Sequence, residues 1–188
     1  MRAPGASIAH HAPMAAAVRI RSATPTDADA ITAVVSVAFP SPLEARLVAA
    51  LREAGRLIVE LVADLDGRLV GHIAFSPVTI AGAPQVPGLG LAPLAVLPEC
   101  QGQGIGGRLI ELGLEAASRA DAAFVVVLGE PRVYGRFGFE RADRRGFDNE
   151  YGAGEQFMVL ELRRGALDGL RGLVRYDATF ARILEANG

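Results

Sequence analysis

The stretch from Leu94 to Gly107, Leu-Ala-Val-Leu-Pro-Glu-Cys-Gln-Gly-Gln-Gly-Ile-Gly-Gly, decides how the fold of this sequence is interpreted. An apolar run ends at Pro98, and glycine then occupies positions 102, 104, 106 and 107, where a helical pattern begins. Glycine places no side chain between the backbone N–H groups and a ligand. Because the first turn of a helix also attracts negative charge, the stretch predicts a cradle for a pyrophosphate.

Two well-known phosphate-binding loops fit this stretch poorly. A P-loop needs Gly-x-x-x-x-Gly-Lys-Ser/Thr; Gly102 and Gly107 have that separation, but Arg108 stands where the lysine belongs. The dinucleotide fingerprint Gly-x-Gly-x-x-Gly matches Gly102, Gly104 and Gly107. It also needs an acidic residue at the end of the next strand, and Asp121 precedes the next apolar run instead of ending it. Both loops are therefore disfavoured.

A third type of phosphate-binding loop fits this stretch better, and it is typical of one protein family. Gln101-x-x-Gly104-x-Gly106 resembles the Gln/Arg-x-x-Gly-x-Gly/Ala signature of the GNAT superfamily of acyl-CoA-dependent N-acyltransferases. Further along the chain, Tyr134-Gly-Arg-Phe-Gly-Phe139 is similar to the Tyr-x-x-x-Gly-Phe of that family. The two motifs occur in the family's order, and the resemblance spans roughly residues 18–162, nearest to small bacterial predicted N-acetyltransferases.

The resemblance implies a fold and a donor site. The fold is a single α/β domain over residues 18–188, with a mixed, mostly antiparallel sheet that splays near its middle and carries helices on both faces. Loop amides would bind the pyrophosphate of coenzyme A, and the backbone of the preceding strand would bind its pantetheine arm. The coenzyme A contacts expected on this basis are Leu94, Ala95, Val96, Gly102, Gln103, Gly104, Ile105, Gly106, Gly107 and Arg108.

Tyr134 is the expected catalytic residue, again by resemblance. A phenol near the sulfur can protonate or hydrogen-bond the departing thiolate. The structural alternative is packing beside Phe137 and Phe139, and the register of the motif favours catalysis. The general base stays open among four residues, of which a lone histidine on an apolar strand is more often a core residue than a base. These four are Glu44, His72, Ser76 and Glu130.

Composition narrows the class of protein. The net charge is −2 and the 19 basic residues are scattered, which disfavours a nucleic-acid partner. No apolar run reaches the roughly 18 residues of a membrane span. The single cysteine, Cys100, excludes an internal disulfide and a cysteine-rich metal site, and a reducing cytoplasm is the expected location. A filler role for Cys100 is favoured over a covalent acetyl-cysteine route.

The function expected from these features is an acetyl-CoA-dependent N-acetyltransferase that needs no metal. It would transfer an acyl group to a primary amine by direct attack in a ternary complex. A non-catalytic acyl-CoA-binding or regulatory module is the alternative. The acceptor, the acyl chain length and the choice between monomer and homodimer stay open.

Periodicity and turn residues predict the elements. We expect residues 1–17 to form a disordered tail, since His and Pro interrupt its apolar residues, and Asp27 to cap the first helix. Asp66-Gly67 predicts a hairpin turn, residues 82–88 a turn-rich connection and residues 141–155 a solvated loop. The helix after the glycine loop is expected to bury Ile105, Leu109, Leu112 and Ala116. The expected strands are 18–21, 57–63, 69–75, 89–97, 124–128, 139–142 and 155–162, and the expected helices are 27–39, 43–54, 104–119, 131–137 and 178–186.

Overall fold

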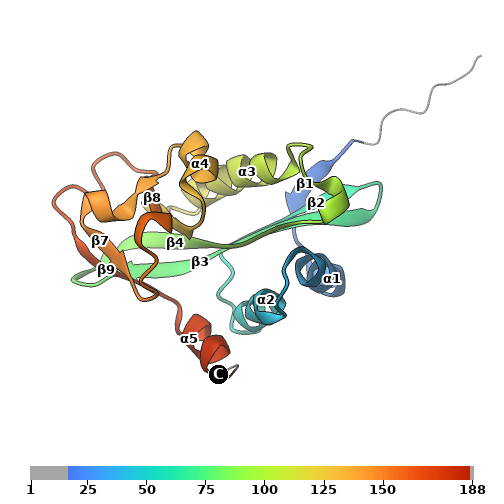
Figure 1. The fold of residues 1–188 in the computed structure, drawn as a ribbon, viewed down its shortest axis with the longest axis horizontal. Helices are drawn as coiled ribbons and strands as arrows, with labels where there is room; N and C mark the ends of the chain where they lie inside the picture. The colour runs from blue at the N-terminus through green and yellow to red at the C-terminus, as the bar shows by residue number, and fades with distance from the viewer. Residues whose placement is uncertain (1–16, 187–188) are drawn as a thin grey trace, which may run out of the picture.

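A nine-stranded sheet runs through the part of the chain that the structure, a computed structural model, describes, namely residues 17–186 (Figure 1). The strands are β1 (Arg19–Ser22), β2 (Val59–Leu65), β3 (Arg68–Ile80), β4 (Ala83–Val96), β5 (Phe124–Leu128), β6 (Glu140–Arg141), β7 (Phe147–Asn149), β8 (Phe157–Glu161) and β9 (Gly172–Tyr176). Their order is β1-β2-β3-β4-β5-β8-β6, and β9 pairs with both β3 and β7. The expected tail lies outside the described residues, apart from Ala17.

Helices cover both faces of this sheet, as the sequence predicted. They are α1 (Ala28–Ala38), α2 (Leu43–Glu53), α3 (Ile105–Arg119), α4 (Pro131–Tyr134) and α5 (Ala178–Glu185). In Figure 1, α3 and α4 lie above the sheet, and α1, α2 and α5 lie below it. Within the described residues, no helix is both long and apolar enough to cross a membrane.

The hairpin between β2 and β3 forms where it was predicted. Asp66 and Gly67 both have positive φ, 52° and 86°, which is the geometry of a two-residue hairpin turn. The Asp64 carboxylate accepts the Gly67 N–H at 2.7 Å and closes the turn.

The connection into β4 is a strand rather than the turn-rich segment expected over residues 82–88. The chain reverses at Ala81-Gly82, and β4 begins at Ala83. Pro84 and Pro87 precede Gly88, the first residue of β4 that pairs with β5. On that side the prolines therefore remove no ladder hydrogen bond, which is why a strand tolerates them there.

The central strands β4 and β5 separate partway along their length. They pair in parallel only from Gly88 to Leu91 on β4, although β4 continues to Val96. The register between β3 and β4 shifts at the same place, because Ile73 pairs with Leu94 but Phe75 pairs with Leu91. The bulge thus falls on Ala92 and Pro93, and the expected splay near the middle of the sheet is confirmed.

The inner face of α3 differs from the expected one. Gly113 and Ala117 are buried, whereas Leu112 and Ala116 are half-buried. A Cβ built at Gly113 would lie 2.6 Å from the ring of Phe75 on β3. The missing side chain lets α3 approach the sheet closely, and a glycine gives no apolar signal by which sequence could have placed it on the inner face.

The region expected to be a solvated loop, residues 141–155, contributes to the sheet. Phe147 and Asn149 on β7 are buried, and β7 pairs in parallel with β9. The Asn149 side-chain oxygen accepts the N–H groups of Tyr151 at 2.9 Å and Ala153 at 3.2 Å. The short strand β9, also missed, extends the sheet along the far half of β3.

The start of α1 also differs from the expected cap. Asp27 is the residue before the helix, but its carboxylate makes no cap hydrogen bond to α1. It accepts two hydrogen bonds from Arg21, at 2.7 and 2.9 Å, and one from the Thr24 N–H at 2.7 Å. Asp27 therefore ties β1 to the turn that precedes α1.

Candidate active site

The glycine loop presents free backbone donors at the start of α3. Gly102 and Gly104 have φ of 74° and 83°, a left-handed conformation that disfavours side chains, and Gly104 is the N-cap residue of α3. The N–H groups of residues 105–107 have no acceptor within the described part of the chain. Unpaired donors at a helix N-terminus form an anion site. The loop therefore has the chemistry expected for binding a pyrophosphate.

The first turn of α3 lies on the end of β4. A Cβ built at Gly106 would lie 3.7 Å from Val96 Cγ2 and 3.9 Å from Leu94 Cδ2, which is ordinary contact. Positive φ thus requires glycine only at Gly102 and Gly104 among the four. The packing of α3 on β4 therefore brings the expected coenzyme A contacts of the strand next to those of the glycine loop.

Hydrogen bonds identify which backbone groups of β4 face the splay. The Leu97 N–H donates to the Val70 carbonyl on β3 at 2.9 Å, and Gln101 Nε2 donates to the Val96 carbonyl at 3.0 Å. Backbone groups alternate in direction along an antiparallel strand. Leu94 and Val96 therefore turn their N–H and C=O groups toward the open edge, whereas those of Ala95 turn toward β3.

Side chains of the loop serve partly to hold its own shape. Gln101, the first residue of the motif, anchors the loop to β4 through its bond to Val96 and was not counted among the expected contacts. Gln103 Nε2 donates to the Glu99 carbonyl at 3.2 Å, so Gln103 offers a ligand mainly its backbone N–H. The motif itself was the signal that could have identified Gln101.

Tyr134 lies at the end of α4, above the end of β5. A Cβ built at Gly129 would lie 2.2 Å from the Tyr134 ring, so only glycine fits beneath it. The ring packs edge-on against Phe139 at 5.7 Å and is 9% exposed. Burial raises the pKa of the Tyr134 hydroxyl, which keeps the proton on the oxygen at neutral pH. Tyr134 thus carries a proton that it can donate.

The tyrosine segment and the glycine loop adjoin in space. A Cβ built at Gly107 would lie 3.5 Å from Phe137 Cζ, so the turn after α4 rests against the first turn of α3. Beside the loop is a cavity of about 300 Å³, and Arg108, exposed and without an ion pair among the described residues, contributes to its wall. Its lining residues are Val18, Ile20, Gln103, Gly104, Ile105 and Arg108.

The four residues left open as the base lie in different settings. His72 is fully buried on β3, and its Nε2 lies 2.9 Å from Glu60 Oε1, which Arg52 also contacts at 2.5 Å. Burial opposes ionisation of Glu60, but the hydrogen bonds from His72 and Arg52 outweigh it and hold its pKa below the ordinary value. His72 is therefore part of a structural network. Ser76 Oγ and Glu44 Oε2 are shielded without a partner, and Glu130 is exposed.

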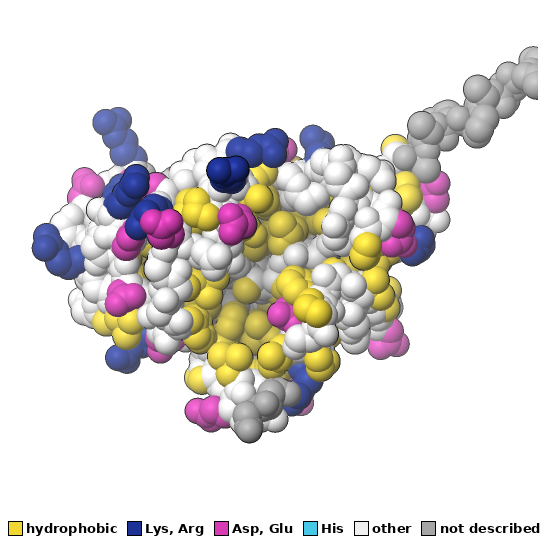
Figure 2. All heavy atoms as spheres, in the orientation of Figure 1, with side chains coloured by type: hydrophobic (Ala, Val, Ile, Leu, Met, Phe, Trp, Pro, Cys, Tyr) yellow, Lys and Arg dark blue, Asp and Glu magenta, His cyan; other side chains and the backbone are white. Residues whose placement is uncertain are grey.

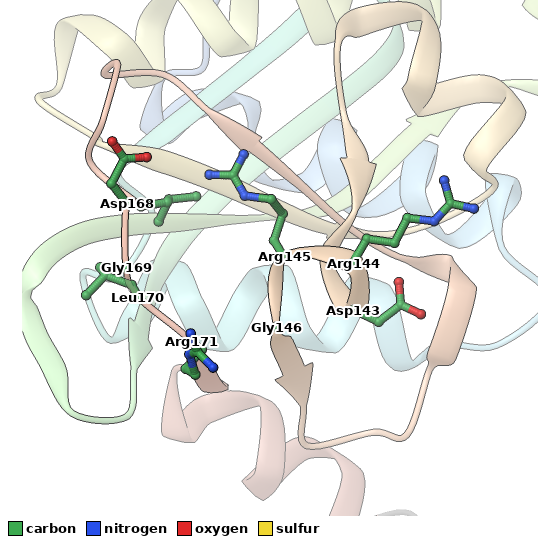
Figure 3. A pocket seen from close by; sticks show the side chains of 9 residues that line it. Asp143, Arg144, Arg145, Gly146, Asp168, Gly169, Leu170 and Arg171 are labelled. Atoms are coloured by element: carbon green, nitrogen blue, oxygen red, sulfur yellow. The ribbon is translucent and has the colours of Figure 1, made fainter.

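A second, polar pocket lies away from these residues. It has a volume of about 560 Å³ and is bounded by the 143–146 turn and the 167–171 loop. Figure 3 shows Arg145 and Asp168 projecting into the space between these two segments. Arg145 is already paired with Glu140 at 2.8 Å. Neither Tyr134 nor any expected coenzyme A contact lines this pocket, so it is separate from the candidate site.

Comparison of the sequence with known proteins finds a matching family model and similar relatives. A family model described as an acetyltransferase (GNAT) domain matches residues 19–142. The chain is 41% identical over 166 residues to the uncharacterised N-acetyltransferase YhbS of Escherichia coli strain K12, across 87% of this chain and 99% of that protein.

Solved structures agree with the sequence relatives. The structure of E. coli YhbS in complex with CoA superposes with a TM-score of 0.86 and 40% identity, covering 92% of this chain and 97% of that one. A GNAT family acetyltransferase from Brucella melitensis in complex with acetyl-CoA gives a TM-score of 0.73 and 38% identity, covering 87% and 98%. Among the described residues, no group of three or more His, Cys, Asp and Glu side chains is placed to hold a metal ion.

Proposed function

The chain belongs to the GNAT family of acetyltransferases, and from that premise we propose that it transfers an acetyl group from acetyl-coenzyme A to a primary amine. One observation carries the proposal: unpaired N–H groups at the start of α3 adjoin an open edge of β4 and the segment that bears Tyr134. The two similar structures with CoA and acetyl-CoA support the choice of donor.

The proposed donor contacts divide by chemistry. The N–H groups of residues 102–107, Gln103 included, would bind the pyrophosphate, and Arg108 would add a charged contact to phosphate. Leu94 and Val96 would hydrogen-bond the pantetheine arm through their backbones, as a neighbouring strand does. Ala95 would contribute packing alone, since its backbone groups face β3.

The proposed reaction relies mainly on positioning. The amine nitrogen forms a bond to the thioester carbonyl carbon, and a backbone N–H of the open β4 edge polarises the carbonyl oxygen. As the C–S bond breaks, the sulfur takes the proton of the Tyr134 hydroxyl. The neutral attacking nitrogen gives up a proton to water in the same step, and water returns a proton to the Tyr134 oxygen, so that the products are the amide and the free thiol.

Location and assembly are further proposals. A single cysteine suits a reducing compartment, and we place the reaction in the cytoplasm. A homodimer is the assembly we propose, and sedimentation at several protein concentrations tests it.

The test of the function separates catalysis from binding. Thiol release is measured with acetyl-CoA and a panel of primary amines, and acetyl-CoA affinity is measured by calorimetry on the same protein. Turnover with at least one amine supports the proposal. Tight acetyl-CoA binding without turnover of any amine identifies the non-catalytic binding module instead, and no binding of acetyl-CoA rejects both.

A further inference from the structure

Four side-chain polar atoms in the described residues are shielded from solvent and have no hydrogen-bond partner. They are Glu44 Oε2, His72 Nδ1, Ser76 Oγ and Tyr176 Oη. An unpaired buried polar atom is costly, so a group of them needs an explanation.

These atoms belong to one side of the sheet, the side opposite α3. On β3, Gly71 faces α3, since a Cβ built there would lie 3.0 Å from Leu109. Successive side chains on a strand alternate between faces, so the even-numbered His72 and Ser76 point the other way. Tyr176 on β9 pairs with Val78 on β3, and its ring lies against Gly90, the partner of Ser76. The sheet therefore carries a row of unsatisfied polar groups beneath the splay.

Glu44 faces the same region from α2. Glu44, Leu47 and Leu51 are spaced three and four residues apart, which puts them on one face of the helix. Leu51 is fully buried in the hydrophobic cluster that contains Tyr176, and Leu47 and Ala92 pack against that cluster. The helix face that bears Glu44 is thus turned toward the same side of the sheet as His72, Ser76 and Tyr176.

Glu44 lies in the first turn of α2, and its charge has no counter-ion among the described residues. Ser41 Oγ accepts the Leu43 N–H at 3.0 Å, between the prolines that separate α1 from α2. Glu44 makes no ion pair with the described residues. A first-turn carboxylate is ordinarily stabilised by water and the helix dipole, but one oxygen of this carboxylate is shielded. A cation from outside the chain would remove the penalty.

The surroundings of Glu44 are otherwise apolar. Figure 2 shows a hollow in the middle of the molecule whose visible side chains are mostly hydrophobic. The cluster on this side of the sheet contains Tyr176, and Leu47, Ala92 and Ala153 pack against it. These groups match an apolar body attached to the cation.

The other charged and titratable groups around this region are already engaged or neutral. Glu60 on β2 is hydrogen-bonded by Arg52 from α2 and by His72 from β3. Burial, with smaller contributions from Tyr151 and Glu150, raises the pKa of Tyr176 far above neutrality. Glu150 accepts the Tyr176 N–H at 3.1 Å. Glu44 is the carboxylate in this set that has no partner.

We propose that Glu44 is a catalytic residue that binds the acceptor's ammonium group and accepts its proton, and that the acceptor is a primary amine on an apolar body without a neighbouring carboxylate. The inference rests on the proposed acetyl transfer. The Glu44 carboxylate takes one proton from R–NH₃⁺ and leaves a lone pair on nitrogen, which attacks the thioester carbon. A second nitrogen proton passes to water as the C–S bond breaks, and water returns one proton to the Tyr134 oxygen that protonated the sulfur. Glu44 gives its proton to solvent after the product leaves, so one proton is released for each turnover.

The charge of Glu44 also explains the exclusion of a carboxylate. A carboxylate beside the reacting amine would lie close to Glu44 in an apolar hollow, where like charges repel strongly. Butylamine and norvaline test this, because norvaline is butylamine with a carboxylate added to the carbon that bears the nitrogen.

The experiment compares Glu44→Gln with Glu53→Gln, a control on the exposed end of the same helix. With butylamine near pH 7, we expect Glu44→Gln to lower kcat/KM about 100-fold, the scale of losing a general base. The acetyl-CoA Kd should stay within about twofold of wild type, because Glu44 lies across the sheet from the donor loop. Near pH 10 the deficit should shrink, since roughly a quarter of an amine with a pKa of about 10.4 is neutral there, far more than near pH 7.

Three results would overturn the proposal: equal activities of Glu44→Gln and Glu53→Gln, a deficit that is the same near pH 7 and pH 10, or equal use of norvaline and butylamine by the wild type. If melting shows that Glu44→Gln is unfolded, Glu44→Asp against Glu53→Asp decides by the same criteria. Absence of turnover by the wild type with every amine, despite acetyl-CoA binding, would reject the proposed function itself and this inference with it.

Discussion

The glycine loop and the opposite face of the sheet are built by different means. The loop uses main-chain N–H groups of consecutive residues, shaped by positive φ at Gly102 and Gly104. The opposite face gathers side chains from α2, β3 and β9, and its polar atoms are unpaired. A site made of backbone can be recognised from a short stretch of sequence, whereas a site made of side chains exists only after distant elements have packed.

Tyr134 lies over Gly129, directly after β5, and its substitution has the largest expected effect. Tyr134→Phe keeps the ring contact with Phe139 but removes the proton donor, so kcat should fall about 100-fold. The acetyl-CoA Kd and the melting temperature should change little. Stopped assays of thiol release measure kcat, and calorimetry measures the acetyl-CoA Kd and the melting temperature. Tyr151→Phe is the matched control, and equal activities of the two variants would assign Tyr134 to packing alone.

Asp27 is the counterpart of Glu44, because its carboxylate is fully paired. Removing its charge in Asp27→Asn should lower the free energy of unfolding by about 1.5–3 kcal/mol, the value of hydrogen bonds to a charged group. Coenzyme A affinity should not change. Urea unfolding at neutral pH measures the loss, and a loss below about 0.5 kcal/mol would contradict it.

The ion pair of Asp27 with Arg21 predicts that the free energy of unfolding depends on pH. The hydrogen bonds from Arg21 hold the pKa of Asp27 well below its usual value of about 3.9. The stabilisation is therefore complete above the unfolded pKa and is lost as pH falls through the lower, folded pKa. The difference in stability between wild type and Asp27→Asn should shrink only in strong acid. A difference that stays constant from neutral pH into strong acid would count against the ion pair.

Substitutions at two glycines of the loop test whether its backbone conformation determines coenzyme A affinity. Gly104→Ala forces a side chain into the left-handed region, at a cost of about 1–2 kcal/mol. If binding needs that conformation, coenzyme A affinity should fall roughly tenfold. Gly106→Ala adds a Cβ with room of 3.7 Å to its nearest neighbour and should change affinity less than about twofold. Calorimetry with coenzyme A decides, and equal losses would mean that bulk rather than conformation matters.

The smallest effect is expected at the ion pair that precedes the loop. Arg68 and Glu99 are 2.7 Å apart, with side chains 64% and 54% exposed. Exposed pairs contribute little, so Arg68→Gln should leave the melting temperature unchanged and coenzyme A affinity within about twofold. A clear loss of affinity would instead make this pair part of the loop's support.

Local signals predicted much of the fold. The turn at Asp66-Gly67, the end of α2 before Gly55 and the buried strand β5 all follow from residues adjacent in sequence. The predictions failed where pairing comes from far along the chain. Strand β9 forms because β3 and β7 offer it edges, and the 82–88 segment is a strand because β3 pairs with part of it.

The candidate site divides in the same way. Its glycine motif and its tyrosine motif were both visible in sequence, but their contact through Phe137 and Gly107 was not. Nor was the direction of the Ala95 backbone, which depends on how β4 registers with β3. Glu44 was one of several possible bases in the sequence, and only the packed fold shows that one of its oxygens is shielded without a partner.

The sequence alone determined the backbone cradle, since a positive φ and a missing Cβ are properties of single residues and need no partner to be recognised. Tertiary structure alone decided which segments meet, because the contact of Phe137 with Gly107 and the shielding of one Glu44 oxygen are set by how helices pack on both faces of one sheet. Chemistry carried by the main chain can therefore be inferred from a motif. Chemistry carried by converging side chains depends on the packed fold.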